Sequence, residues 1–303
     1  MLFRSTARQL GENLLPGTGA YREIFLEQPA AALANANEEP LYGPTYLPRK
    51  FKIALAVPPQ NDIDVFAHDL GFIAMVENGA LVGYNVTVGG GMGMTHKAPA
   101  TFPRLGDVVG FCDAADVFAV AEHTMCIQRD YGDRKDRSHA RFKYTIEDRG
   151  TDWFREELAR RLGRPLQPAR NFQFVSSGDY FGWQRGSDGR WHYTLFVENG
   201  RVADLPDRPL MSGLRAIATA HPGIFALTTN QNVTIAGVED ADRPAIEALL
   251  REYRIENAAG STALRQHSIA CVAFPTCGLA MAESERYLPS LLDKLYGDRK
   301  SVV

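Results

Sequence analysis

Hydrophobic and polar residues alternate most clearly in Leu47–Asp64, LPRKFKIALAVPPQNDID. Successive side chains of a β-strand point to opposite faces. One face of the predicted strand carries two lysines and then two alanines: Lys50, Lys52, Ala54 and Ala56. The other face is apolar and is the expected core side: Phe51, Ile53, Leu55 and Val57. The strand is predicted to begin after Pro48, which cannot donate into a ladder, and to end at Pro58-Pro59.

The lysine-alanine face has two interpretations. An edge strand uses lysines as guards against aggregation, and its lysines are then simply solvated. Alternatively, the small alanines leave room above the sheet, and the two ammonium groups reach over a flat or anionic ligand. Spacing does not separate the two. Gln60 and Asn61 add polar groups at the corner that follows.

Residues 41–145 read as one α/β unit, and a separate helix follows it. Strands are predicted over 72–76 and 81–88, joined by the hairpin signal Glu77-Asn78-Gly79. A helix is predicted over 114–129, and a capped amphipathic helix over 150–165. The basic run Asp130–Lys143 between them is either a solvated loop or a contact for an anionic ligand.

A second, smaller unit is predicted over 182–255, with the order β-β-α-β-β-α. Its strands are expected at 191–197, 224–229 and 231–238, and its last helix shows one apolar face. Glu198-Asn199-Gly200 repeats the earlier turn, which weakly suggests duplication. A further helix is expected at Leu279–Tyr296.

Composition limits the function classes. The chain has 303 residues, a formal net charge of -3 and 23% charged residues, so no global basic field favours nucleic acid. The sequence shows no signal-peptide core and no apolar run of transmembrane length. A cytoplasmic protein without a nucleic-acid or membrane partner is the expectation.

Gly89, Gly90 and Gly91 follow a predicted strand, with His96 just beyond. The dinucleotide and P-loop fingerprints both fail here, because neither the third glycine nor a GK[ST] follows at the required spacing. What remains is a loop whose unhindered backbone N–H groups suit carboxylates or phosphates. The alternative is a tight turn that needs positive φ.

The four cysteines fall into two groups. Cys112 and Cys126 are most simply small buried residues. Cys271 and Cys277 have five residues between them, including Pro275, a wider spacing than structural zinc pairs use. They supply two of the four thiolates of an iron–sulfur cluster, or they are two more buried cysteines.

Five motifs together resemble one family: LPRKFK, PPQNDID, VGGGMGMTH, TNQNVTIAG and ACVAFPTCGLAMAESER. They are similar to the haemoprotein (beta) subunits of assimilatory NADPH-dependent sulfite reductase, within the sirohaem-containing nitrite and sulfite reductases. The match runs from about residue 8 to about residue 296. The resemblance implies a mixed α+β and α/β architecture, in which ferredoxin-like half-domains alternate with larger sirohaem-binding domains.

On this resemblance the chain divides into four segments. Residues 1–40 are a remnant helix and linker, and 41–165 form the first sirohaem-binding domain. Residues 182–255 form a ferredoxin-like half-domain, and 256–303 begin a second sirohaem-binding domain. The family's second cysteine pair and its N-terminal half-domain are missing, so the chain is expected to be an internal fragment.

The resemblance also implies the chemistry. It gives Lys50 and Lys52 the roles of binding the substrate anion and delivering protons. Arg49 and Arg141 match residues that contact the cofactor, and the remaining cofactor-binding positions are expected at Gln60, Asn61, Gly89, Gly90, Gly91 and His96. Cys271 and Cys277 match the first two ligands of a [4Fe–4S] cluster that is coupled to sirohaem.

The implied reaction is the six-electron reduction of sulfite to sulfide, with electrons from NADPH through a flavoprotein (alpha) subunit. A sirohaem nitrite reductase, or a non-catalytic module that binds a tetrapyrrole or an anion, is the alternative.

Overall fold

The computed structural model describes residues 2–17, 39–257 and 261–300. It divides into two compact units, residues 1–177 and 178–303. Part of the predicted linker, residues 18–38, lies outside the described residues. Within the described ranges, no helix combines the length and the apolar character needed to cross a bilayer.

Unit 1 is built on a four-stranded sheet with the order β1-β3-β4-β5. Strands β3 (Leu70–Glu77) and β4 (Ala80–Val88) form the predicted hairpin, and Asn78 and Gly79 take φ values of 51° and 77° at its tip. Strand β1 (Ile53–Ala56) pairs parallel with β3, and β5 (Asp107–Asp113) pairs antiparallel with β4. Asparagine and glycine tolerate positive φ, which is why this dipeptide could be read from the sequence.

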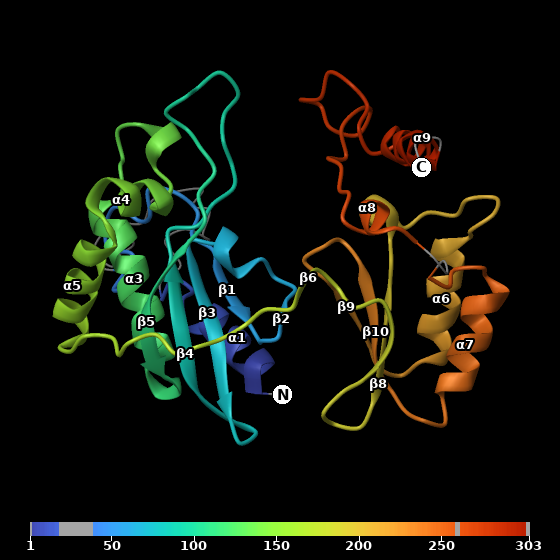
Figure 1. The fold of residues 1–303 in the computed structure, drawn as a ribbon, viewed down its shortest axis with the longest axis horizontal. Coiled ribbons are helices and arrows are strands. Elements are labelled where there is room, and N and C mark those ends of the chain that lie inside the picture. The colour runs from blue at the N-terminus through green and yellow to red at the C-terminus, as the bar shows by residue number, and fades with distance from the viewer. Residues whose placement is uncertain (1, 18–38, 258–260, 301–303) are drawn as a thin grey trace, which may run out of the picture. The chain divides into compact units, whose positions relative to one another are not determined.

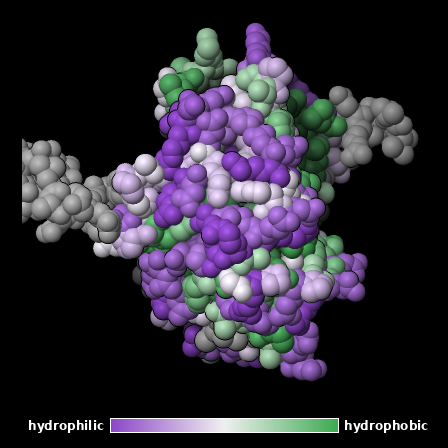
Figure 2. Space-filling model, turned by 90° about the vertical axis from the view of Figure 1, so that its left-hand side faces the viewer, coloured by the Kyte–Doolittle hydropathy of each residue, from purple (hydrophilic) through white to green (hydrophobic). Residues whose placement is uncertain are grey.

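The described part of this unit contains four α-helices: α1 (Leu2–Asn13), α3 (Val117–Tyr131), α4 (Phe142–Arg149) and α5 (Thr151–Leu162). Figure 1 shows α3, α4 and α5 gathered beside the sheet. Buried residues of α1, α3, α4 and α5 share one apolar core with β3, β4 and β5. Figure 2, which looks onto this side of the molecule, shows a mainly hydrophilic surface, so the outer faces of these helices are solvated.

The two faces of the predicted strand are confirmed, but its start and the expected room above its alanines are wrong. Strand β1 begins at Ile53, so Lys50 and Lys52 lie before it. Phe51, Ile53, Leu55 and Val57 pack against the main core, as predicted. Ala54 and Ala56 are each only 1% exposed, because a second apolar cluster covers them. That cluster includes Phe172 and Phe174, on the segment leading to β6 (Ser176–Ser177), which pairs parallel with β2 (Gln60–Asn61). The alanines are therefore a packing surface for a distant segment.

Unit 2 has the predicted β-β-α-β-β-α order. Its strands are β7 (Gly182–Arg185), β8 (Trp191–Leu195), β9 (Ile224–Leu227) and β10 (Val233–Val238). They form an antiparallel sheet with the order β7-β8-β10-β9. Helices α6 (Leu210–Ala220) and α7 (Arg243–Glu252) bury Ile217, Ile246 and Leu250 in its core.

Two local predictions for unit 2 are wrong. Glu198-Asn199-Gly200 forms a short 3₁₀ turn, η4, and no hairpin joins at it. The last helix, α9, covers Leu288–Lys300 and begins later than Leu279. Pro289 explains the shift, since proline fits the first turn of a helix and disrupts its interior. A short helix, α8 (Ala263–Gln266), precedes the cysteine loop.

Candidate functional site

Asp69 is the centre of the candidate site in unit 1. Its side chain has no solvent exposure, and it lies directly before β3. Oδ1 accepts hydrogen bonds from Nε and Nη2 of Arg141 at 3.3 and 3.1 Å, and Oδ2 accepts from the backbone N–H of Lys52 at 3.0 Å. One carboxylate thus joins two predicted site residues that are far apart in the sequence.

Electrostatics explain why this contact is a strong constraint. Burial raises the pKa of the Asp69 carboxyl, while the Arg141 guanidinium and the Lys52 backbone N–H oppose that shift. A buried carboxylate is tolerated only with such partners.

Sequence reasoning missed Asp69. The available signal was an acidic residue directly before an apolar strand, in His68-Asp69-Leu70.

The predicted catalytic lysines stand at the exposed entrance to β1. Lys50 and Lys52 are exposed, and Arg49 is half-buried. Among the described residues, none forms an ion pair with these three side chains, although most other arginines of unit 1 have acidic partners. Their charges are therefore available to an external anion. That Lys50 and Lys52 act on a common ligand stays a prediction.

Lys143 has a structural role. It is 1% exposed, and Nζ donates to the carbonyl oxygens of Gly91 at 3.0 Å, Gly93 at 2.7 Å and Phe102. Burial and the nearby Arg141 lower the pKa of this ammonium group. The basic run Asp130–Lys143 is therefore not uniformly solvated. Its last lysine is buried and binds carbonyl oxygens of the glycine loop.

The glycine loop lies beside the same centre, but its amides are not free. The N–H groups of Gly89, Gly90 and Gly91 donate to the carbonyl oxygens of Asp69, His68 and Arg104 at 2.9, 3.0 and 2.8 Å. The expectation of unhindered N–H groups is therefore wrong. The glycines are needed for close approach: a Cβ on Gly90 would lie 2.1 Å from the carbonyl oxygen of Phe66.

The loop nevertheless lies next to a predicted cofactor contact. A Cβ on Gly91 would be 3.2 Å from Nη2 of Arg141. A role for the three glycines as a wall of the cofactor site stays a prediction.

The remaining predicted residues are more peripheral. Asn61 accepts the backbone N–H of Val65 through Oδ1 at 2.9 Å, so its side chain shapes the corner. Gln60 belongs to the short strand β2, and His96 is exposed beyond the glycines. Their roles as cofactor contacts stay predictions.

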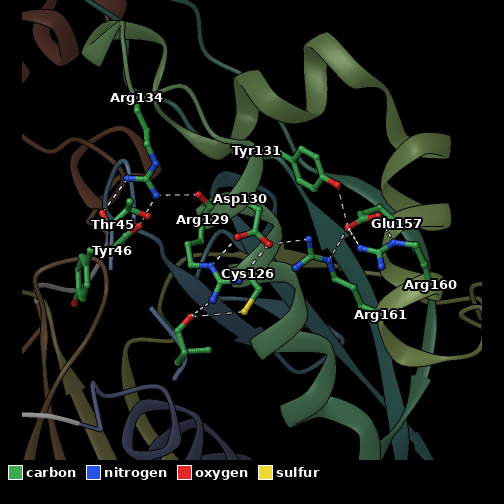
Figure 3. Close-up of polar contacts among 11 residues, drawn as sticks. Thr45, Tyr46, Cys126, Arg129, Asp130, Tyr131, Arg134, Glu157, Arg160 and Arg161 are labelled. Atoms are coloured by element: carbon green, nitrogen blue, oxygen red, sulfur yellow. Dashed lines mark hydrogen bonds and ion pairs between the residues drawn. The ribbon is translucent and has the colours of Figure 1, made fainter. Parts of the chain in front are cut away.

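Arginines at the end of α3 fix the segment that leads to Arg49 (Figure 3). Arg134 donates to the carbonyl oxygens of Thr45 at 3.0 Å and Tyr46 at 2.5 Å, and Arg129 donates to that of Leu41 at 2.6 Å. Backbone carbonyls held by guanidinium groups restrict how the following residues move. The entrance to β1 is thereby tied to α3.

The same network continues into α5. Asp130 accepts from Arg161 at 2.9 Å, and Arg161 and Arg160 both donate to Glu157 at 2.7 Å (Figure 3). Hydrogen bonds from Arg160 and Arg161 lower the pKa of Glu157 to about 2. The Arg161–Asp130 pair links α5 with α3, and the pairs with Glu157 lie within α5.

The cysteines divide as predicted. Cys112 and Cys126 are buried in unit 1, and burial raises the pKa of both thiols, that of Cys112 to about 12. Cys271 is exposed and Cys277 is half-buried, on one loop of unit 2. The described residues contain no cluster of three metal-binding side chains. Cysteine thiols are the ligand type that such a cluster takes, and the role of Cys271 and Cys277 as two of its four ligands stays a prediction.

Two family models match the chain, one in each compact unit. Residues 5–166 match the nitrite and sulphite reductase 4Fe-4S domain, and residues 184–253 match the nitrite/sulfite reductase ferredoxin-like half domain. The chain belongs to the nitrite and sulfite reductase family, and the expected fold class is confirmed.

Individual relatives narrow the comparison. The sulfite reductase [NADPH] hemoprotein beta-component of Shouchella clausii is 56% identical over 291 residues, and that of Chromohalobacter salexigens is 58% identical over 294 residues. Each alignment covers 95% of this chain and 51% of the relative, so the chain spans about half the length of these curated relatives. The resemblance to this haemoprotein group is confirmed.

A solved structure, the Mycobacterium tuberculosis NirA protein, matches with a TM-score of 0.68 at 25% identity. The match covers 86% of this chain and 46% of the other.

Proposed function

We propose that this chain is part of the cytoplasmic haemoprotein of an assimilatory sulfite reductase, which reduces sulfite to sulfide with six electrons. The carrying observation is the 56% identity over 291 residues with a sulfite reductase haemoprotein, a match that extends through both units. The cofactors are sirohaem and a [4Fe–4S] cluster, which supply electrons to the substrate when bound. The electrons come from NADPH through a flavoprotein (alpha) subunit.

The exposed cations perform the substrate chemistry. Sulfite is an anion whose desolvation is costly, and the ammonium groups of Lys50 and Lys52 offset that cost. Each oxygen of sulfite that leaves as water takes up protons, and a positioned ammonium group donates one. The exposure of both lysines supports this assignment, as does the absence of an ion pair from either ammonium group to a described residue.

Arg49 and Arg141 hold the carboxylates of the tetrapyrrole. Arg141 contacts Asp69 through Nε and Nη2, and no hydrogen bond from its Nη1 is found among the described residues. Asp69 therefore orients the guanidinium, and the free edge can meet a cofactor carboxylate. Cys271 and Cys277 provide two of the cluster thiolates. Cys112 and Cys126 do not, because they are buried in unit 1.

The test uses the native holoprotein that carries these 303 residues, combined with its flavoprotein. NADPH oxidation and sulfide formation are measured with sulfite and, separately, with nitrite. We expect three NADPH oxidised per sulfide and a higher kcat/KM for sulfite. A higher kcat/KM for nitrite would identify a nitrite reductase, and a tetrapyrrole absorption band without turnover or an iron–sulfur signal would identify a non-catalytic binding module.

A further inference from the structure

The second Glu-Asn-Gly sequence has no hairpin to close, yet it keeps the conformation of a tight turn. In η4 (Glu198–Gly200), Asn199 has φ 53° and Gly200 has φ 69°. Positive φ is uncommon outside glycine, asparagine and aspartate. The turn lies between β8 and α6, and its side chains reach the segment that carries the cysteines.

The Asn199 side chain ties together the two ends of the cysteine loop. Its Oδ1 accepts the backbone N–H of Ala270 at 3.2 Å, and its Nδ2 donates to the carbonyl oxygen of Glu285 at 3.1 Å. Ala270 directly precedes Cys271, and Glu285 follows Cys277. One amide therefore fixes the backbone on both sides of the two thiols.

Neighbouring side chains strengthen the same attachment. Arg201 forms a bidentate ion pair with the carboxylate of Glu285. The Glu285 side chain is only 6% exposed. Glu198 pairs with Arg265 of α8, which also pairs with Asp293 of α9. Every member of this group joins the turn to the segment that carries the cysteines.

The cysteine loop has few other constraints. Within it, the N–H of Cys277 donates to the carbonyl oxygen of Ala273 at 2.8 Å, and that of Phe274 donates to Ala282 at 3.2 Å. These bonds close the loop on itself and do not attach it to the sheet. Beside it lies a cavity of about 560 Å³, lined by Asn199 and by both chain neighbours of Cys271, Ala270 and Val272.

We propose that Asn199 is a positioning residue for the iron–sulfur cluster. The turn Glu198–Arg201 holds the cysteine loop in the conformation in which Cys271 and Cys277 bind the cluster. This inference rests on the proposed function, because it needs a cluster at these cysteines. Asn199 acts only through the backbone of the cysteine loop. Partners that hydrogen-bond a metal ligand directly typically alter metal affinity by about 10- to 100-fold when lost. Asn199 holds the residue next to a ligand, so we expect an effect at the lower end of that range.

Three variants of the holoprotein isolate the effect. Asn199→Gly removes both hydrogen bonds and adopts the same φ without strain. Asn199→Asp keeps an acceptor for the Ala270 N–H but cannot donate to Glu285. Asn78→Gly is the matched control, because Asn78 has a similar φ of 51° in the other Glu-Asn-Gly turn, at the hairpin tip of unit 1.

The measurements are iron and acid-labile sulfide content, the rate of cluster loss to a chelator, and the paramagnetic resonance spectrum and midpoint potential of the reduced cluster. Asn199→Gly should lose its cluster about 10-fold faster than wild type and show an altered spectrum and potential. The cluster-loss rate of Asn199→Asp should lie between those of Asn199→Gly and wild type. Asn78→Gly should match wild type in all of these measurements.

Each outcome has a distinct meaning. An Asn199→Gly protein that melts earlier but keeps the wild-type loss rate, spectrum and potential would overturn the positioning role and leave the proposed function intact. A wild-type holoprotein without any cluster would overturn both.

Discussion

Replacing Asp69 by asparagine should destabilise unit 1 and weaken its cationic site. The change keeps the shape of the side chain but removes the charge that faces Arg141. It also turns one acceptor into a donor, so either an Arg141 N–H or the Lys52 N–H loses its partner. Arg141 would remain beside a neutral group with only 16% of its side chain exposed.

The size of the effect follows from this burial. Removing one partner of a buried ion pair costs about 3–5 kcal/mol, and the partial exposure of Arg141 favours the lower end, about 3 kcal/mol. For a unit of 177 residues, a loss of this size lowers the melting temperature by roughly 6–12 °C.

Calorimetry and denaturant unfolding of the chain would measure this loss. Asp152→Asn is the control, because Asp152 pairs with Arg155 on α5 with both side chains exposed, and such pairs contribute about 0–1 kcal/mol. The double variant Asp69→Asn/Arg141→Gln should be less destabilised than the sum of its single variants, by roughly 0.5–3 kcal/mol. If Asp69→Asn cost no more than Asp152→Asn, the reasoning about the buried pair would be refuted.

Three further predictions concern the same unit. In the holoprotein, Lys52→Met should lower turnover about 100-fold or more while the sirohaem absorbance stays unchanged; unchanged turnover would remove Lys52 from the mechanism. Gly90→Ala should lower the free energy of unfolding by about 3 kcal/mol, since its Cβ would strike a carbonyl oxygen, whereas Gly93→Ala, with nothing within 4 Å of its Cβ, should be near neutral. Equal melting temperatures for these two variants would contradict the packing role. Because hydrogen bonds from Arg160 and Arg161 lower the pKa of Glu157 from 4.5 to about 2, its stabilisation is complete above pH 4.5 and is lost as the pH falls toward 2. Acid titration of the melting temperature should show a loss on the order of 2–3 kcal/mol in that range, and Glu157→Gln should lack this part of the pH dependence.

Local pattern predicted several elements of this protein, although it missed β5 and α4. The strict alternation before Pro58 predicted which side of β1 faces the main core, and the main-core contacts of Phe51 and Leu55 confirm it. The dipeptide Asn78-Gly79 predicted the hairpin, because its φ requirement is met by only a few residue types. The β-β-α-β-β-α order followed in the same way from changes of period along the chain.

Sequence also identified candidate chemistry through residue type. Two lysines in an otherwise apolar alternating stretch, and two cysteines with five residues between them, can be noticed without coordinates. Their accessibility in the structure agrees with that interpretation.

Only the tertiary structure decided which polar groups have hydrogen-bond or ion-pair partners within the protein. The Asp69–Arg141 pair, the three carbonyls around Lys143 and the amide of Asn199 join segments separated by tens of residues. Periodicity reports the environment of one residue relative to its chain neighbours, whereas a buried polar group takes any partner that folding brings within about 3 Å. Only the folded chain could therefore show that the backbone N–H groups of Gly89, Gly90 and Gly91 already have hydrogen-bond partners. The same holds for the buried hydrogen bonds of Lys143 and for the contacts of Asn199 with the cysteine loop.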